Sequence, residues 1–73
     1  MAIVDVKTEI TGNVWKIVAE PGTRLEEDET IMILESMKME IPVSAPQDGT
    51  VAEILVEPEQ SVSEGDVVAR IEV

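Results

Sequence analysis

The fold of this 73-residue chain is decided by a stretch that occurs twice, as GNVWKIVAEP at residues 12–21 and as GTVAEILVEP at residues 49–58. The match continues without a gap, so that residues 12–36 align on residues 49–73 at a constant offset of 37. Because repeats with periods of roughly 20 to 50 residues indicate stacked or symmetric units, we predict one domain, residues 1–73, made of two equivalent halves.

Both copies have the composition of short β-strands. Valine and isoleucine dominate apolar runs at residues 3–6, 14–18, 31–34, 51–56 and 67–71, and Pro–Gly and Gly–Asp pairs stand between the runs. β-Branched residues fit a pleated sheet, and these pairs are typical of turns. Two copies are too few for a capped solenoid, whereas two small sheets related by a pseudo-two-fold axis close one core. The sequence therefore predicts an all-β flattened barrel or sandwich of two small antiparallel sheets.

The composition excludes several classes of function. The chain has 16 acidic and 5 basic residues, a formal net charge of −11, and neither cysteine nor histidine. Disulfides, zinc sites built on Cys and His, and Ser–His or Cys–His catalytic pairs are thereby excluded. The negative charge argues against nucleic acid or an anionic membrane surface as a partner, because both bind basic patches.

The location of the protein is also predicted from what the sequence lacks. It has no apolar run near the length of about 18 residues that spans a membrane, and it does not start with the basic and then apolar segments of a signal peptide. We expect a soluble cytoplasmic protein with no membrane partner, and a monomer in isolation.

An unusual stretch, ESMKME at residues 35–40, begins at the end of the first copy and runs into the segment between the two copies. Strand-like residues on both sides predict a β-hairpin with Lys38 at its turn, although the turn has no glycine, asparagine or proline of the kind that tight hairpins prefer. Met37 and Met39 frame the lysine. Exposed methionines gain no burial, which indicates recognition by another protein; partial burial as core fillers is the alternative.

The hexapeptide resembles the attachment motif of biotin carboxyl carrier domains, whose hallmark is Met-Lys-Met preceded by alanine or serine. The similarity extends to APQDGTV at 45–51, which resembles the family's Ala/Ser-Pro-x-x-Gly-x-Val turn, and to EGD at 64–66, which resembles its Gly-Asp turn. The match covers residues 12–73, and the chain is most similar to the short free-standing biotin/lipoyl attachment proteins. The resemblance implies a flattened barrel with the modified lysine on a hairpin at one end.

The resemblance also implies a function. A biotin protein ligase would biotinylate Lys38 through an amide bond to its side-chain nitrogen, with Met37 and Met39 recognised beside it. A biotin carboxylase would load the ureido ring using ATP and bicarbonate, and a carboxyltransferase would pass the carboxyl group to an acceptor. In such a carrier the cofactor does the chemistry and the protein supplies position and recognition. No catalytic residue and no metal site is therefore expected in this chain.

Two positions depart from the family's pattern or from the repeat. Residues 27–29, Glu-Asp-Glu, stand where the family often has Gly-Asp, which predicts a left-handed backbone at Asp28. Glu59 follows Pro58 where Gly22 follows Pro21, which predicts turns of different type. The gap-free repeat leaves no room for the protruding thumb of some acetyl-CoA carboxylase carriers. The chain lacks the Ala/Pro-rich linker that usually tethers such domains to a larger subunit, so we expect either a separately encoded carrier or an excised domain. Met1-Ala2 followed directly by a strand pattern favours the separately encoded carrier.

Alternatives to these assignments stay open. Lipoyl domains of 2-oxo acid dehydrogenase complexes have the same fold and resemble Asp-Lys-Ala at the tip, where this chain has Met37-Lys38-Met39. A third hypothesis is an unmodified interaction domain or a biotin store without a carboxylase. The acidic run at 26–29 lacks the spaced ligands and glycine of a calcium loop, which favours a solvated turn. Trp15 has no clear face in its strand pattern, and a packing role is expected.

Overall fold

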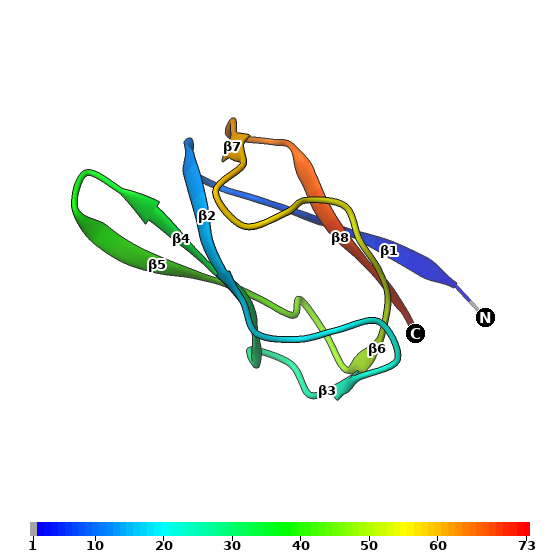
Figure 1. Cartoon of the computed structure of the whole chain (residues 1–73). Helices are drawn as coiled ribbons and strands as arrows, with labels where there is room; N and C mark the ends of the chain where they lie inside the picture. Colours follow the sequence, from blue (N-terminus) through cyan, green and yellow to red (C-terminus); the bar gives the residue numbers. More distant parts are fainter. Residues whose placement is uncertain (1) are drawn as a thin grey trace.

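The computed structural model describes residues 2–73, and within them two four-stranded antiparallel sheets face each other, in the orders β1-β8-β6-β3 and β5-β4-β2-β7 (Figure 1). This confirms the predicted all-β sandwich. The domain is elongated, with extents of 36 × 17 × 17 Å. No helix in the described range is long and apolar enough to cross a membrane. The strands are β1 (Ile3–Lys7), β2 (Gly12–Ile17), β3 (Arg24–Leu25), β4 (Thr30–Ser36), β5 (Met39–Ser44), β6 (Gly49–Ile54), β7 (Ser61–Val62) and β8 (Val67–Glu72).

The two sheets contain equivalent strands, whose residues are related by the 37-residue offset of the sequence repeat. β2, β3 and β4 correspond to β6, β7 and β8, but the short strands are exchanged between the halves. β3 pairs with β6 through Leu25 opposite Gly49, and β7 pairs with β2 through Val62 opposite Gly12. Each half therefore contributes a strand to the sheet of the other, as Figure 1 shows for β3 beside β6 and β7 beside β2.

The structural correspondence extends beyond residues 12–36 and 49–73. β1 pairs with β8 as β5 pairs with β4, so that Val6 opposite Ala69 matches Val43 opposite Met32. Ser36 and Met39 are joined by the Met37–Lys38 turn, whereas the equivalent residues, Val73 and Ala2, are held together by two backbone hydrogen bonds of 3.3 and 2.9 Å. The β4–β5 hairpin and the two ends of the chain thus lie at opposite poles of the molecule (Figure 1).

An aliphatic core fills the space between the sheets. Burial of apolar surface stabilises a fold by roughly 25 cal/mol per Å², and it has to act here without disulfides. The buried hydroxyl of Thr8 is satisfied locally, since it donates to the Ile10 carbonyl at 2.9 Å and accepts from the Ile10 amide at 3.1 Å. The largest fully buried side chains are Ile31, Met32, Leu34, Ile71, Val14, Val51 and Val68.

Strands β2 and β6 each contain a β-bulge at the same place in the repeat. The pairing register skips one residue between Val14 and Lys16 in β2, and between Val51 and Glu53 in β6. The extra residues are Trp15 and Ala52. A bulge leaves its extra residue outside the ladder and increases the local twist, so that these two side chains take equivalent, unpaired positions in the two halves.

Two predictions about turns have different outcomes. Asp28 has a left-handed backbone with φ of 72°, as predicted. The prediction that the turns at Gly22 and Glu59 differ in type was wrong, because both residues are left-handed, with φ of 94° and 74°. The reason is a shared tertiary contact: the Gly22 amide donates to the Val51 carbonyl at 2.8 Å, and the Glu59 amide donates to the Val14 carbonyl at 2.6 Å. Anchoring to the bulged strand fixes the turn, and Glu59 bears a cost of about 1–2 kcal/mol.

Arg70 links three strands on the outer face of its sheet. From β8 it makes ion pairs with Asp5 of β1 at 3.0 Å and with Glu53 of β6 at 3.5 Å. The hydrogen bond and charge of Asp5 raise the pKa of Arg70, and Glu53 adds a smaller contribution. All three side chains are substantially exposed, so these pairs are a minor source of stability.

Candidate functional site

A two-residue turn presents Lys38. β4 ends at Ser36 and β5 begins at Met39, and the residues between them have φ of 52° at Met37 and 64° at Lys38. Two consecutive left-handed residues make a type I′ turn, whose twist matches that of the flanking strands. The predicted hairpin is confirmed. Since Asn-Gly is the usual sequence for this turn, Met-Lys bears about 1–2 kcal/mol of strain per residue, and such strain clusters at functional sites.

The base of the hairpin is tied to the body of the domain. The Ser36 hydroxyl donates to the Thr11 carbonyl at 3.0 Å, and the Thr11 hydroxyl accepts from the Glu64 amide at 3.0 Å. A Cβ on Gly12 would lie 2.5 Å from the Glu35 carbonyl oxygen, so that only glycine permits this approach of β2 to β4. Sequence reasoning missed the role of these residues, although the repeated Gly12 and Gly49 were a signal for close backbone contact.

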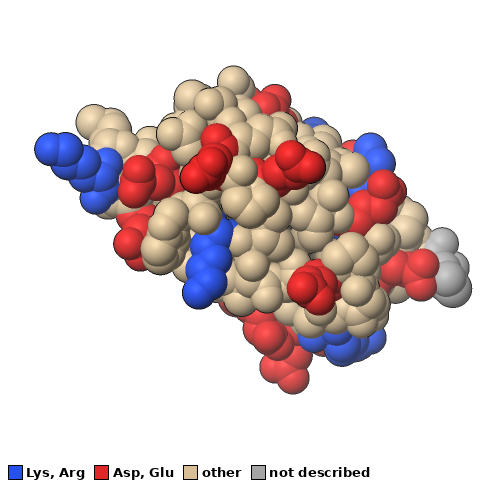
Figure 2. All heavy atoms as spheres, viewed as in Figure 1, with Lys and Arg blue, Asp and Glu red and all other residues tan. Residues whose placement is uncertain are grey.

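The side chains at the turn lie in solvent. Met37 is 92% exposed and Met39 is 61% exposed, so that the core-filler alternative does not hold. Lys38 is also exposed, and within residues 2–73 it makes no ion pair. Figure 2 shows a basic side chain projecting from the hairpin pole, on a face that also carries scattered acidic groups and other basic side chains. The arrangement offers a primary amine that a large enzyme can reach from several directions.

Two like charges flank the turn on neighbouring strands. Glu35 of β4 lies directly opposite Glu40 of β5, one pair further from the turn than Ser36 and Met39. Directly opposed like charges destabilise a sheet, and Lys38 is the basic residue nearest to them in the sequence. Acylation of the lysine nitrogen would remove this cation.

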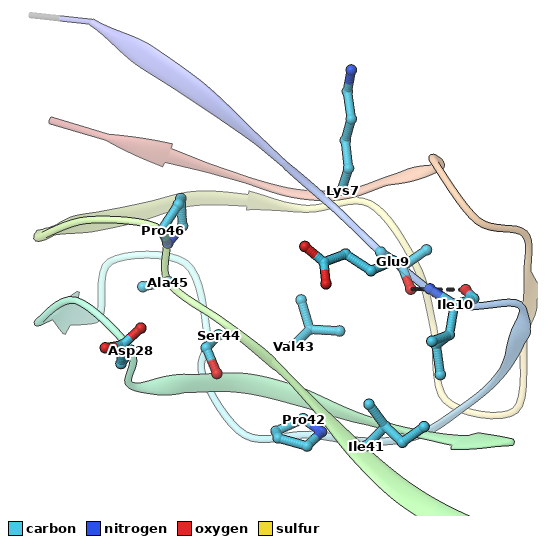
Figure 3. Close-up of a pocket in the computed structure, with 11 residues that line it drawn as sticks. Lys7, Glu9, Ile10, Asp28, Ile41, Pro42, Val43, Ser44, Ala45 and Pro46 are labelled. Carbon is cyan, nitrogen blue, oxygen red and sulfur yellow. Dashed lines mark hydrogen bonds between the residues drawn. The ribbon is translucent and has the colours of Figure 1, made fainter.

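A cavity of about 370 Å³ lies on the flank of the molecule, between the β1–β2 loop and β5. Ile10, Ile41 and Pro46 contribute to its lining, together with Lys7, whose side chain extends away from the other lining residues (Figure 3). Neither Lys38 nor the two methionines line it. The amine is therefore presented on a protruding turn and does not emerge from this cavity.

The acidic run at 26–29 is organised by hydrogen bonds to the backbone. Glu29 accepts from the Glu26 amide at 2.9 Å, and Asp48 accepts from the Glu27 amide at 2.8 Å. Carboxylates thus serve as turn caps here. Within residues 2–73 there is no group of three or more acidic side chains placed to hold a metal ion.

Known proteins with similar sequences and similar structures share this fold. The family model described as "Biotin-requiring enzyme" matches residues 1–71. A biotin/lipoyl attachment protein of Bacillus subtilis (strain 168) is 39% identical over 66 residues, which cover 90% of each chain. The structure of Kluyveromyces lactis urea carboxylase superimposes with a TM-score of 0.94 at 36% identity, over 99% of this chain and 6% of that one. The lipoyl domain of the 2-oxoglutarate dehydrogenase complex of Azotobacter vinelandii superimposes with a TM-score of 0.78 at 26% identity, over 96% of each chain. The chain belongs to the biotin/lipoyl attachment domain family.

Proposed function

We propose that this protein is a biotin carrier and that Lys38 is the residue that becomes biotinylated. The observation that carries the proposal is the strained type I′ turn, which holds an exposed lysine between two exposed methionines at one pole of the domain. Family membership supports covalent attachment of biotin or lipoate. Similarity to a domain of a urea carboxylase favours biotin.

The residues around Lys38 suit an acylation of its side-chain nitrogen. The side-chain nitrogen must attack an activated carboxyl group, and Lys38 presents that nitrogen in solvent. Met37 and Met39 offer flexible apolar contacts on either side of that nitrogen. The bond from Ser36 to Thr11 and the close approach at Gly12 keep the turn in a fixed direction.

Once attached, biotin supplies the carboxyl-carrying chemistry and the chain supplies its delivery. A hairpin at the end of a molecule 36 Å long can enter the active site of a partner while the body stays outside. Tethering raises the effective concentration of the cofactor at each site. The partners on this proposal are a biotin protein ligase, a biotin carboxylase and a carboxyltransferase, and the chain itself is not catalytic.

The lipoyl carrier is the second candidate, because a lipoyl domain has the same fold over nearly the whole chain. The side chains at the tip favour biotin, since Met37 and Met39 flank the lysine where lipoyl domains resemble Asp-Lys-Ala. A biotin protein ligase and a lipoate ligase offered the same protein in separate reactions distinguish the two carriers. We expect modification by the first enzyme alone.

The carboxylase role is tested with protein that has already been biotinylated. Biotin carboxylase from the same host, ATP and isotopically labelled bicarbonate should place label on the biotinylated chain, and none on a Lys38→Arg chain taken through the same ligase reaction. A biotinylated chain that acquires no label from any host carboxylase would instead support the storage hypothesis.

A further inference from the structure

A second surface feature lies beside the hairpin and does not involve the lysine. It is a groove of about 460 Å³ whose floor includes the buried Val14. Trp15, the single aromatic residue of the chain, is 49% exposed along it. Two exposed carboxylates, Glu35 and Glu59, also line it, and within residues 2–73 neither is part of an ion pair. The lining residues are Asn13, Val14, Trp15, Glu35, Pro58 and Glu59.

The pseudo-symmetry shows which side chains create the groove. Trp15 is the extra residue of the β2 bulge, and its equivalent in the β6 bulge is Ala52. Glu59 has a left-handed backbone, and its equivalent is Gly22, with the same turn and the same anchoring bond to the bulged strand. The backbone is thus shared, but the other half has neither an indole nor a carboxylate at these positions.

Glu59 is notable because its position suits glycine. A left-handed backbone strains any residue with a Cβ. Gly22, the equivalent residue in the other half, has no Cβ and bears no such strain. Observed backbone strain supports a functional hypothesis for the side chain that bears it. The carboxylate of Glu59 is therefore a candidate for recognition, together with the indole that lies along the same groove.

We propose that this groove binds an arginine side chain of a partner protein that approaches the hairpin pole. A guanidinium stacks on an indole face, and carboxylates accept its N–H groups. The groove has an indole and two carboxylates and no basic residue in its lining. A net charge of −11 also favours encounter with a basic surface.

The position of the groove connects it to the hairpin. Glu35 belongs to β4 and lies three residues before Lys38 in the chain. It pairs with Asn13 of β2, which also lines the groove. A partner that places an arginine over Trp15 therefore contacts β2 and β4, the strand that leads into the turn, and the groove lining does not include Lys38. The site does not depend on modification of Lys38, so the unmodified protein can be used to test it.

The single tryptophan makes a direct test possible. Protein containing 5-fluorotryptophan at Trp15 is titrated with the blocked peptide acetyl-Gly-Arg-Gly-amide and, separately, with the peptide in which citrulline replaces arginine. Citrulline keeps the shape and removes the charge. We expect a saturable change of the ¹⁹F resonance, and of the Asn13 and Glu59 amide resonances, with the arginine peptide only.

Charge variants separate this site from general attraction to an acidic protein. Glu35→Gln and Glu59→Gln should each weaken binding by about two- to fivefold, as expected for one exposed charge contact. Trp15→Ala, followed by the Asn13 amide, should weaken it by about the same factor. Glu72→Gln removes the same charge at the position equivalent to Glu35 in the other half, and it should leave the affinity unchanged.

Either of two results would overturn the proposal. Equal responses to the arginine and citrulline peptides would show that the groove does not select a guanidinium. Equal weakening by Glu72→Gln and Glu35→Gln would show that the peptide responds to net charge alone. Neither result would bear on the biotinylation of Lys38.

Discussion

Met37 and Lys38 have the left-handed backbone of a type I′ turn without the residues that make it easy to form. The sequence predicted the hairpin and the place of the lysine, because strand-like residues flank the motif. It could not predict two left-handed residues, since neither methionine nor lysine favours that conformation. Asp28 was predictable because the family's Gly-Asp turn has glycine near that position.

Replacement of Met37 by asparagine should stabilise the domain, because asparagine tolerates the left-handed conformation. We expect the free energy of unfolding to rise by up to about 1 kcal/mol, and Tm to rise by about 4–8 °C per kcal/mol in a domain of this size. Thermal unfolding followed by circular dichroism measures the change. Met39→Asn lies in a strand and should give no gain; equal gains from both variants would argue against strain in the turn.

Replacement of both Met37 and Met39 by leucine tests what these exposed side chains do. Because both lie in solvent, the free energy of unfolding should change by less than about 0.5 kcal/mol. The rate of biotin loading by a biotin protein ligase should fall, since the branched side chain cannot adapt as the thioether does. A large loss of stability, with loading unchanged per folded molecule, would indicate a structural role.

At the scale of elements, the bulged strands β2 and β6, and the turns hydrogen-bonded to them, explain which predictions about strands and turns succeeded and which failed. The repeat of β2 and β6 was visible because Gly12, Val14 and Ile17 recur at the same offset. The exchange of β3 and β7 was not predictable, since each strand has two residues and pairs with a distant segment. The turn at Glu59 was mispredicted because a hydrogen bond to Val14 overrides the local preference.

Glu59→Gly should stabilise the protein by about 1 kcal/mol, because it relieves the left-handed strain. The reciprocal change, Gly22→Glu, should destabilise the equivalent turn by about the same amount. Midpoints of urea unfolding for the two variants measure both effects. A loss of stability in Glu59→Gly would mean that the carboxylate contributes more than the strain costs.

Gly12→Ala should destabilise the domain by about 1–3 kcal/mol, because the new methyl group would meet the Glu35 carbonyl at 2.5 Å. Gly49→Ala makes the equivalent contact at the other pole, 2.8 Å from the Glu72 carbonyl. Urea unfolding should show similar losses. Amide hydrogen exchange should show faster exchange in the β4–β5 hairpin for Gly12→Ala alone; unchanged exchange there would contradict the anchoring role of Gly12.

At the scale of the whole molecule, two halves related by a 37-residue offset close an aliphatic core and leave the lysine turn at one pole. The sequence repeat predicted the two sheets, but it was detectable only between residues 12–36 and residues 49–73. β1 and β5 are structural equivalents that share few residues, such as Val6 and Val43. Alternating apolar character is enough to specify such strands, so their equivalence is not visible in the sequence.

The net charge of −11 on a body this small should make stability depend on salt. Screening shortens the Debye length from about 10 Å at 0.1 M to about 3 Å at 1 M ionic strength, which reduces repulsion among the acidic groups. We expect Tm to rise from low salt to 1 M sodium chloride, and equally in potassium chloride. A fall in Tm would mean that the Arg70 ion pairs outweigh the repulsion.

The most direct test of the account is to find which residue carries a cofactor, and which cofactor it is. Protein purified from its native host is digested, and its peptides are mapped by mass spectrometry beside those of a Lys38→Arg variant. We predict one biotinyl group on the peptide that contains Lys38, and none anywhere in the variant. A lipoyl group on Lys38, or biotin on another lysine, would contradict the account.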